Sequence, residues 1–458
     1  MLDIRFIRKN PDLVAEKSKQ KGYNVDIKKL LELDEQRRQL LSQIEEKRAE
    51  KNELSQSRSI SPSPSPADNP PGDVLPPSED ERIKGKKVKG EITELESNLK
   101  PIDEEYWKLL KAVPNMPAED VPVGASEDEN VFGELKGKKP EFDFKPKTHW
   151  EIAESSGLID KARAAKVAGS RFAYIKGDLV KLQLALIQFV VDKLTDEEVL
   201  KKIIQDSGLE NVSSNPFVPV LPPLMIRTEV YDAMDRLEPR EDRYKVGSDE
   251  DDLWLQGSAE HTLGPMYMNE TLDLADLPIR YLGYATSFRR EAGTYGKDTE
   301  GIIRMHQFDK LEMESFVNPE GGLAEHLLFI AIQEYLMTEL GIPYRVVQKC
   351  TADIGKPNAR GIDLEAWLPG ADGFKETHTA DYMTDYQARR LNTKVKKINS
   401  GGEHDTDNMP TNFVHTNDAT ALALGRTMVA IIENYQNKDG SVRIPKALQG
   451  YMPGKTEI

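Results

Sequence analysis

The chain has 458 residues, of which 62 are lysine or arginine and 78 are aspartate or glutamate, so its formal net charge is −16. That length favours two domains with a sizeable buried core, and the single cysteine, Cys350, excludes a disulfide framework and a multi-cysteine zinc site. The acidic balance excludes a protein that coats nucleic acid indiscriminately, so we expect no DNA partner, and any RNA must bind to local patches.

The opening ten residues lack the apolar core of a secretory signal. No apolar run elsewhere in the sequence reaches the length that a transmembrane helix requires. These two observations predict a soluble protein in the reducing cytoplasm, with no membrane partner.

Two segments near the N-terminus carry apolar residues at helical spacing. The first covers residues 27–54, and in the second, residues 88–109, apolar residues recur alternately four and three positions apart. Such spacing draws an apolar stripe along a helix. Because each helix is too polar to be stable alone, we predict an antiparallel two-helix coiled-coil arm. A dimerising coiled coil is the alternative.

Proline marks the connections of this arm. Seven prolines lie between Ser61 and Asp80, which predicts an extended, mobile, proline- and serine-rich tip at about residues 60–80. Pro101 lies inside the second stripe and should kink or split that helix. Three more prolines follow Ala112 and indicate a hinge. We therefore expect a helical arm over residues 1–112 and a second domain over residues 113–458.

The second domain mixes helical and strand-like patterns. Residues 179–194 have a helical pattern, whereas residues 217–220 and 280–291 are strand-like. Long strands flanked by helices without a regular βαβ rhythm are typical of an α+β domain built on a mainly antiparallel sheet.

The most informative segment covers residues 281–316, where two strand-like runs flank a glycine-containing loop and predict a β-hairpin. Alternation places Arg289 and Glu291 on one face of the first strand. The residues that share a face on the second strand are Arg304, His306, Phe308, Lys310 and Glu312. Guanidinium groups suit phosphate oxygens, a ring stacks on a base, and a carboxylate accepts from an amine. The hairpin therefore favours a nucleotide site, with a solvated ion-pair network as the alternative.

Other clusters have weaker signals. Glu376 and Thr379 could offer hard oxygen ligands to a magnesium ion that bridges nucleotide phosphates. Arg426 opens a helix after a strand-like run, where the helix N-terminus favours an anion, although most arginines at such positions are structural. Two basic runs, at residues 84–89 and 389–397, are candidate RNA patches or plain solvated surface.

Several of these segments match long, ordered motifs. Residues 288–293, with Asp298, Thr299, Gly301 and residues 304–312, resemble motif 2 of the seryl-tRNA synthetases. Residues 425–436 are similar to motif 3 of that family, and Pro222 matches the proline of motif 1. The resemblance extends over nearly the whole chain.

The resemblance implies a class II synthetase fold, in which helices flank an antiparallel sheet, plus the N-terminal arm. It implies a serine–tRNA ligase that converts L-serine and ATP into seryl-adenylate and pyrophosphate. The serine is then transferred to tRNA(Ser), with tRNA(Sec) as an open second acceptor. Mg²⁺ bound with ATP, the absence of zinc and a homodimer formed through the motif 1 region are further implications.

The resemblance also assigns site residues by position. Those assigned to ATP are Arg289, Arg290, Glu291, Arg304, Phe308, Glu376, Thr377, His378, Thr379 and Arg426, with Glu376 and Thr379 as the magnesium pair. Those assigned to serine are Ser258, Ala259, Glu260, Glu312 and Thr420. Arg289 should hold the α-phosphate, Glu291 the adenine amino group, and Phe308 should stack on adenine. Buried carboxylates that accept from serine would reject alanine, because its loss of the hydroxyl leaves them unpaired.

Several positions depart from the family pattern, among them the prolines of the arm tip. Ser258 stands where threonine is usual, and His378 replaces a small hydroxyl residue. Asp418 lies in an Asn-Asp-Ala run that replaces Leu-Asn-Gly, and it adds a negative charge beside the serine pocket. Two other functions stay open: an adenylate-forming enzyme that loads a carrier protein, and a catalytically silent relative that binds tRNA. The paired helices argue against the first, and the retained site residues argue against the second.

Overall fold

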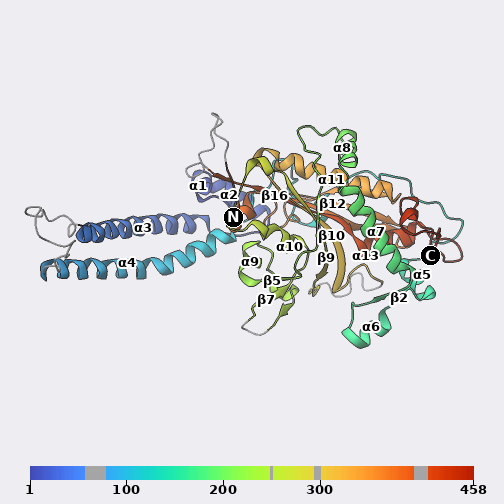
Figure 1. Cartoon of the computed structure of the whole chain (residues 1–458), viewed down its shortest axis with the longest axis horizontal. Helices are drawn as coiled ribbons and strands as arrows, with labels where there is room; N and C mark the ends of the chain where they lie inside the picture. Colours follow the sequence, from blue (N-terminus) through green and yellow to red (C-terminus); the bar gives the residue numbers. More distant parts are fainter. Residues whose placement is uncertain (57–78, 248–250, 293–300, 397–410) are drawn as a thin grey trace, which may run out of the picture. The chain divides into compact units, whose positions relative to one another are not determined.

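The computed structural model describes residues 1–56, 79–247, 251–292, 301–396 and 411–458 (Figure 1). The chain divides into two compact units. The helical unit comprises Leu2–Lys19 and Tyr23–Pro114, and the larger unit comprises Met1, Gln20–Gly22 and Asn115–Ile458. The predicted proline-rich tip lies almost entirely outside the described residues. No helix among the described residues is long and apolar enough to cross a membrane.

In its described residues the helical unit contains two short and two long helices: α1 (Ile4–Lys9), α2 (Pro11–Gln20), α3 (Ile27–Gln56) and α4 (Glu79–Ala112). Helices α3 and α4 pack against each other, and the ion pairs Lys47–Glu91 and Arg48–Glu96, each 2.8 Å long, join them. Arg37, earlier in α3, pairs with Asp103, later in α4, so the two helices are antiparallel, as predicted.

The apolar stripes of the arm are buried where the two helices meet. Leu30, Leu33 and Ile44 of α3 are at most 5% exposed, and the buried positions of α4 include Val88 and Tyr106. Helix α4 runs without interruption through Pro101, so the predicted split does not occur.

The larger unit is built on an eight-stranded sheet with the order β1-β11-β12-β13-β16-β10-β9-β4. In that order the strands are Val131–Phe132, Tyr344–Gln348, Arg360–Leu368, Gly373–Thr384, His415–Ala423, Gln307–Val317, Ile279–Phe288 and Val218–Val220. All neighbouring pairs are antiparallel except β4 and β9, which are parallel. This sheet confirms the predicted α+β class.

Helices cover the apolar face of this sheet (Figure 1). The main ones are α7 (Asp178–Leu194), α11 (Gly322–Glu339) and α13 (Leu424–Asn434), which pack into one core with the strands. Along β10, Leu311 and Met313 enter this core, whereas Lys310 and Glu312 line a cavity. Because side chains alternate along a strand, one face of the sheet forms the core and the other is free to form a polar site.

Smaller elements surround the sheet. The remaining helices are α5 (His149–Ser156), α6 (Lys161–Ala168), α8 (Glu197–Asp206), α9 (Thr228–Ala233), α10 (Glu260–Leu263) and α12 (Tyr386–Leu391). The small sheets pair β2 (Ile159–Asp160) with β3 (Tyr174–Ile175), β5 (Met225–Arg227) and β6 (Lys245–Val246) with β7 (Leu253–Leu255), and β8 (Thr271–Leu272) and β15 (Thr411–Phe413) with β14 (Lys394–Lys396).

The predicted strand over residues 280–291 is too long. Strand β9 ends at Phe288, and Glu291 has a φ of 53°, which an extended strand cannot contain. The second basic run is also not a free patch, because Arg390 donates to the carbonyl of Ala233 and its side chain is only 3% exposed. Arg389 pairs with Asp385 at 2.8 Å.

Candidate active site

A cavity of about 690 Å³ lies on the polar face of the large sheet. It gathers residues from β10, β13, β16 and α13 and from the segments that flank the β9–β10 hairpin. The predicted site residues that line it are Arg289, Glu291, Arg304, Phe308, Glu376, Thr377, Thr379, Arg426, Glu260, Glu312 and Thr420. Arg290, His378, Ser258 and Ala259 are not among the lining residues. The structure therefore brings most of the predicted residues together around one cavity.

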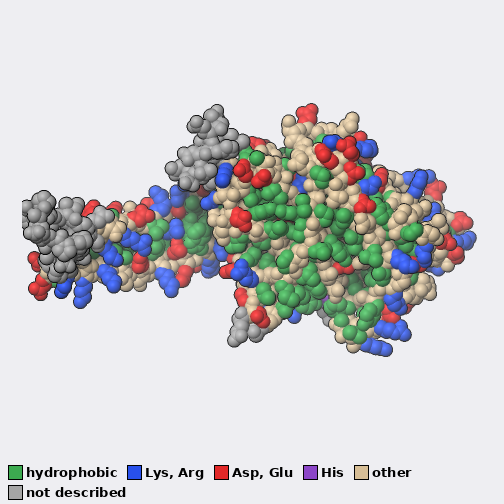
Figure 2. Space-filling model, in the orientation of Figure 1, with side chains coloured by type: hydrophobic (Ala, Val, Ile, Leu, Met, Phe, Trp, Pro, Cys, Tyr) green, Lys and Arg blue, Asp and Glu red, His purple; other side chains and the backbone are tan. Residues whose placement is uncertain are grey.

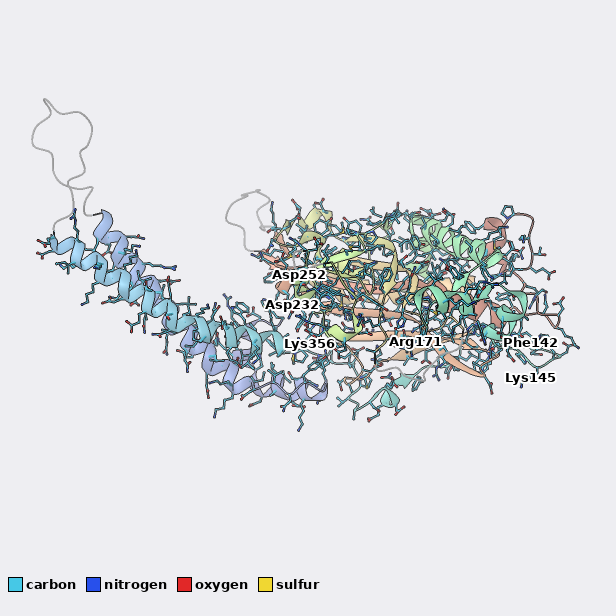
Figure 3. All side chains as sticks on the ribbon, turned by 90° about the horizontal axis from the view of Figure 1, so that it is seen from below. Phe142, Lys145, Arg171, Asp232, Asp252 and Lys356 are labelled. Carbon is cyan, nitrogen blue, oxygen red and sulfur yellow. The ribbon has the colours of Figure 1, made fainter. Side chains whose placement is uncertain are left out.

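The hairpin supplies an arginine and a ring on the same side. Arg289 donates from Nε to the carbonyl of Gly257 at 3.0 Å, and its guanidinium carbon lies 5.3 Å from the centre of the Phe308 ring. Arg304 forms an ion pair with Glu291. Arg171, labelled in Figure 3, donates to the backbone carbonyl of Glu291 at 3.2 Å and holds the turn in place.

Arg290 and His306, which are close in sequence to Arg289 and Phe308, do not line the cavity. The exposed Arg290 has its guanidinium carbon 5.1 Å from the centre of the Tyr244 ring, and its backbone N–H donates to Asp242. Both arginines lie beyond the end of β9 at Phe288, and Arg289 lines the cavity whereas Arg290 does not. His306, which the period-two pattern placed on the nucleotide face, contacts the Phe172 ring instead and does not line the cavity.

A buried histidine fixes the chain just before the second strand. His149 lies with Nδ1 3.0 Å from a carboxylate oxygen of Glu433, and its Nε2 accepts from the backbone N–H of Ile302. Gly301 has a φ of 64°, and a Cβ there would lie 1.7 Å from His149 Nε2, so only glycine fits. No sequence motif indicated His149, because it lies far from the hairpin along the chain.

Arg426 and Glu376 form one end of the cavity. Arg426, in the first turn of α13, lies with Nη1 2.7 Å from Glu376 Oε1 and 2.9 Å from the Glu376 carbonyl oxygen. Burial works to raise the pKa of Glu376, but Arg426, Lys349 and Arg289 together outweigh it, and the pKa is lowered. Glu376 is therefore an anion whose side chain is 48% exposed. An exposed carboxylate at this edge is available to a metal ion.

Thr379 lies beside a second carboxylate. Its hydroxyl donates to Asp363 Oδ1 at 2.8 Å, and Lys349 lies 3.4 Å from the other carboxylate oxygen of Asp363. Burial raises the pKa of Asp363 to about 7, against the opposing effect of Lys349. Together with Glu376, these groups offer the hard oxygen ligands that Mg²⁺ prefers. Sequence reasoning missed Asp363 and Lys349, since neither belongs to a recognisable motif.

His378 has a structural environment. Its Nδ1 lies 2.8 Å from the hydroxyl oxygen of Thr377, and complete burial lowers its pKa to about 4. In the register of the sheet it stands opposite Leu364, a core residue, so it faces the apolar side. Alternation places Thr377 and Thr379, on either side of His378, on the cavity face. A bulge at this point shifts the register of β13 against β12, so that Glu376 reaches the cavity as well.

The other end of the cavity is acidic and buried. Strand register places Glu312 directly opposite Thr420. Lys310 Nζ lies 2.5 Å from Glu312 and 3.7 Å from Glu260. Burial raises the pKa of Glu312 to about 7, although Lys310 opposes this change. Paired carboxylates of this kind can accept from the ammonium and hydroxyl groups of a small amino acid.

Ser258 and Ala259 contact residues of the acidic end of the cavity without lining the cavity themselves. Ser258 is fully buried and its hydroxyl donates to Glu260. Ala259 packs in a small apolar cluster with Leu263 and Ala285. Ser258 therefore orients a carboxylate of the cavity, and neither residue lines it.

Arg236 is a further cavity residue that the sequence did not indicate. Its Nη2 lies 3.1 Å from Asp418 and 4.0 Å from Asp381, and its Nε lies 3.8 Å from Glu260. Burial and the nearby Glu260 raise the pKa of Asp418 well above its ordinary value, against the effect of Arg236. Arg236 follows α9 in an irregular segment, where no strand or helix period applies.

Two family models match the chain. The seryl-tRNA synthetase N-terminal domain matches residues 1–117, and the tRNA synthetase class II core domain (G, H, P, S and T) matches residues 244–435. The chain is 38% identical to the serine–tRNA ligase of Geotalea uraniireducens over 100% of both chains. It is 36% identical to the serine–tRNA ligase of Nitrosopumilus maritimus, again over 100% of both.

Solved structures give the same result. The seryl-tRNA synthetase from Pyrococcus horikoshii, complexed with ATP, superposes with a TM-score of 0.82 at 36% identity and covers 100% of this chain and 99% of its own. The cytoplasmic serine–tRNA ligase from Naegleria fowleri, in complex with AMP, superposes with a TM-score of 0.81 at 28% identity and covers 100% and 98%. The chain therefore belongs to the seryl-tRNA synthetase family, with a class II catalytic core.

Proposed function

We propose that this chain is a serine–tRNA ligase whose cavity binds ATP and L-serine side by side. The observation that carries the proposal is the division of charge along the cavity. Arg289, Arg304 and Arg426 lie toward the nucleotide end, and Glu260 and Glu312 lie at the other. Each end also holds ions of the other sign, Glu291 and Glu376 beside the arginines and Arg236 and Lys310 beside the buried carboxylates. Guanidinium groups suit phosphates and buried carboxylates suit an ammonium, so the arrangement favours one orientation of the two substrates.

The reaction requires positioning more than a protein nucleophile. The serine carboxylate attacks the α-phosphorus, the bond to the bridging oxygen of the β-phosphate breaks, and pyrophosphate leaves. Arg289 is placed to neutralise charge on the α-phosphate, and Arg426 is placed for the outer phosphates. Phe308 stacks on adenine, and Glu291 accepts from its amino group. Catalysis in such a site comes from fixed orientation and preorganised charge.

The metal that accompanies ATP is Mg²⁺ rather than zinc. Glu376 and Thr379 would hold it, with Asp363 behind Thr379, because these groups supply oxygen donors only. Bound there, the ion would offset the charge of the phosphates.

The acceptor is tRNA(Ser), bound through the helical arm, and tRNA(Sec) is a second acceptor to be tested. Lys84, Lys86, Lys87 and Lys89 lie on exposed positions of α4 and supply a local basic surface despite the acidic chain. Such a patch attracts phosphates by charge alone. The enzyme works in the cytoplasm.

A homodimer is part of the proposal. Apolar side chains lie exposed around Pro222: Val218 at 54%, Leu221 at 80% and Met225 at 46%. Figure 2 shows a broad area of hydrophobic side chains on the larger unit. Contiguous apolar surface of this kind is typical of a protein interface. Light scattering should give twice the mass of 51.6 kDa, and a monomer would contradict the dimer.

Two assays test the proposed reaction. Serine-dependent exchange between pyrophosphate and ATP should be measurable with Mg²⁺, because adenylate formation is reversible. A chain without residues 27–111 should retain exchange and lose charging of tRNA(Ser). Absent exchange would reject the adenylate step, and charging that survives the deletion would reject the role of the arm. Loading of a carrier protein by the deleted chain would favour the carrier-loading alternative.

A further inference from the structure

The amino-acid end of the cavity holds more carboxylates than cations. The buried carboxylates there are Glu260, Glu312, Glu314, Asp381 and Asp418, all at most 8% exposed. The cations that form ion pairs with them in the described part of the chain are Arg236 and Lys310. Lys349 pairs with Asp353 and Asp363 instead, at 3.8 and 3.4 Å. His261 lies 3.4 Å from Glu260, but burial lowers its pKa to about 4 and leaves it neutral.

Three of these carboxylates converge on one point. Oxygen atoms of Glu260, Glu312 and Asp418 all lie within 4.8 Å of one another, and all three residues line the cavity. The converging groups therefore share one small volume that a ligand bound in the cavity can reach.

A fourth carboxylate backs this cluster. Glu314 lies two residues after Glu312 on the same face of β10, directly opposite Asp418 in register. It is 1% exposed, and neither of its carboxylate oxygens has a hydrogen-bond partner among the described residues. Glu314 does not itself line the cavity, and burial, together with the nearby Asp418 and Glu260, raises its pKa well above the ordinary value. A positive charge bound beside Asp418 would reduce the repulsion among these buried carboxylates and so would be bound favourably.

Serine satisfies only part of this demand. Its α-ammonium supplies one positive charge, and its hydroxyl is neutral. Resting on the proposed function, we infer that this end of the cavity also accepts an amino acid with a second ammonium on its β-carbon, as in L-2,3-diaminopropionate, and that the chain converts it to an adenylate. The β-ammonium has nearly the size of the serine hydroxyl, and it adds a positive charge and N–H donors next to Asp418, with Glu314 behind it in the sheet.

A divalent cation fits the same carboxylates less well. Arg236 lies within 4.0 Å of Asp418 and Glu260, and Lys310 lies within 4.0 Å of Glu260 and Glu312. Two positive charges so close repel a divalent ion twice as strongly as an ammonium. An ammonium also brings N–H donors, which carboxylate oxygens without partners require.

The test compares three amino acids in ATP–pyrophosphate exchange. We expect kcat/KM for L-2,3-diaminopropionate within about tenfold of that for L-serine, and L-alanine lower by about a thousandfold or more. Asp418→Asn should lower the ratio of diaminopropionate to serine activity by about tenfold, because one partner of the added charge is lost. Glu314→Gln should lower the ratio less. Glu365→Gln is the matched control, since Glu365 pairs with Arg345 at 2.6 Å and does not line the cavity.

Each outcome decides between explanations. Exchange with serine but not with diaminopropionate overturns this inference and leaves the proposed function standing. Exchange with neither amino acid rejects the proposed function as well. A ratio that stays unchanged in both Asp418→Asn and Glu314→Gln overturns the role of these carboxylates. A last experiment is equilibrium dialysis with Mn²⁺ alone. If one ion binds per chain and this binding is lost in Asp418→Asn, the cluster is a metal site and the inference is overturned. Serine exchange in every variant reports that its site is folded.

Discussion

The two ends of the cavity differ in how their charges are held. At the nucleotide end, Arg426 pairs with a Glu376 side chain that is 48% exposed, so solvent can take over when a phosphate displaces the pairing. At the amino-acid end, Glu312 is 2% exposed and Asp418 is 3% exposed, so their charges depend on protein partners. Breaking a solvent-exposed ion pair costs little free energy, because water replaces the lost partner. A buried charged group has no such replacement, so its ligand must supply the opposite charge or hydrogen bonds. This comparison indicates that affinity for phosphate comes from a solvent-exposed ion pair, whereas selectivity for the amino acid comes from buried carboxylates.

The largest expected effect lies at the nucleotide end. Arg289→Ala removes the guanidinium next to Phe308 and should reduce serine-dependent exchange about a thousandfold, because a preorganised charge at the reacting phosphate is lost. Steady-state exchange measures this change. Arg345→Ala serves as a control, since Arg345 pairs with Glu365 and does not line the cavity. If the Arg289→Ala enzyme were as active as the control, Arg289 would have no role in the site.

Substitutions at the buried, amino-acid end of the cavity should change the affinity for serine. Glu312→Gln is expected to raise the KM for serine about a hundredfold, because an acceptor for the ammonium becomes neutral. Burial raises the pKa of Glu312 to about 7, so the carboxylate is ionised above that pH and protonated below it. For the original enzyme, kcat/KM for serine should therefore rise with pH through about 7.

The same pH rise should be missing from the Glu312→Gln enzyme. A rise of equal size in both enzymes would assign the titration to another group and break the proposed contrast between the two ends.

A smaller effect is expected at the exposed carboxylate. Glu376→Gln should raise the Mg²⁺ concentration needed for half-maximal exchange about tenfold, because one oxygen ligand loses its charge. Titration of exchange with Mg²⁺ measures the shift. Glu365→Gln again supplies the comparison, and an identical Mg²⁺ dependence in both variants would exclude Glu376 as a ligand.

The smallest effect separates two adjacent arginines. Arg290 lies outside the cavity, over the Tyr244 ring, so Arg290→Ala should change exchange less than about threefold. This outcome would correct the assignment of Arg290 to ATP that the resemblance implied. A loss as large as that of Arg289→Ala would instead require Arg290 to reach the nucleotide in the bound state.

The antiparallel arm, the α+β class and the hairpin could be predicted because they leave periodic patterns in the sequence. Alternation also predicted that Lys310 and Glu312 share a face. It failed for Glu291, since β9 ends at Phe288 and the chain then turns. Arg236 and Asp363 could not be predicted, because their proximity to the site results from the packing of segments far apart in the chain.

A sequence also does not show which side chains form hydrogen bonds or ion pairs with each other. The resemblance placed Ser258 against serine, yet its hydroxyl donates to Glu260, and His378 turns toward the core instead of the cavity. Asp418 was expected to add a negative charge beside the serine pocket, but it lies 3.1 Å from Arg236, and burial with the nearby Glu260 raises its pKa well above the ordinary value. Motifs therefore indicated which residues gather at the cavity, whereas the structure shows which of them line the cavity and which hold their neighbours.

The most direct test of this account is a crystal structure with a non-hydrolysable seryl-adenylate analogue. We predict that the purine will lie against the Phe308 ring, the phosphate mimic against Arg289, and the seryl ammonium within hydrogen-bonding distance of Glu312. An analogue bound in the reverse direction, or bound outside the cavity, would contradict the account.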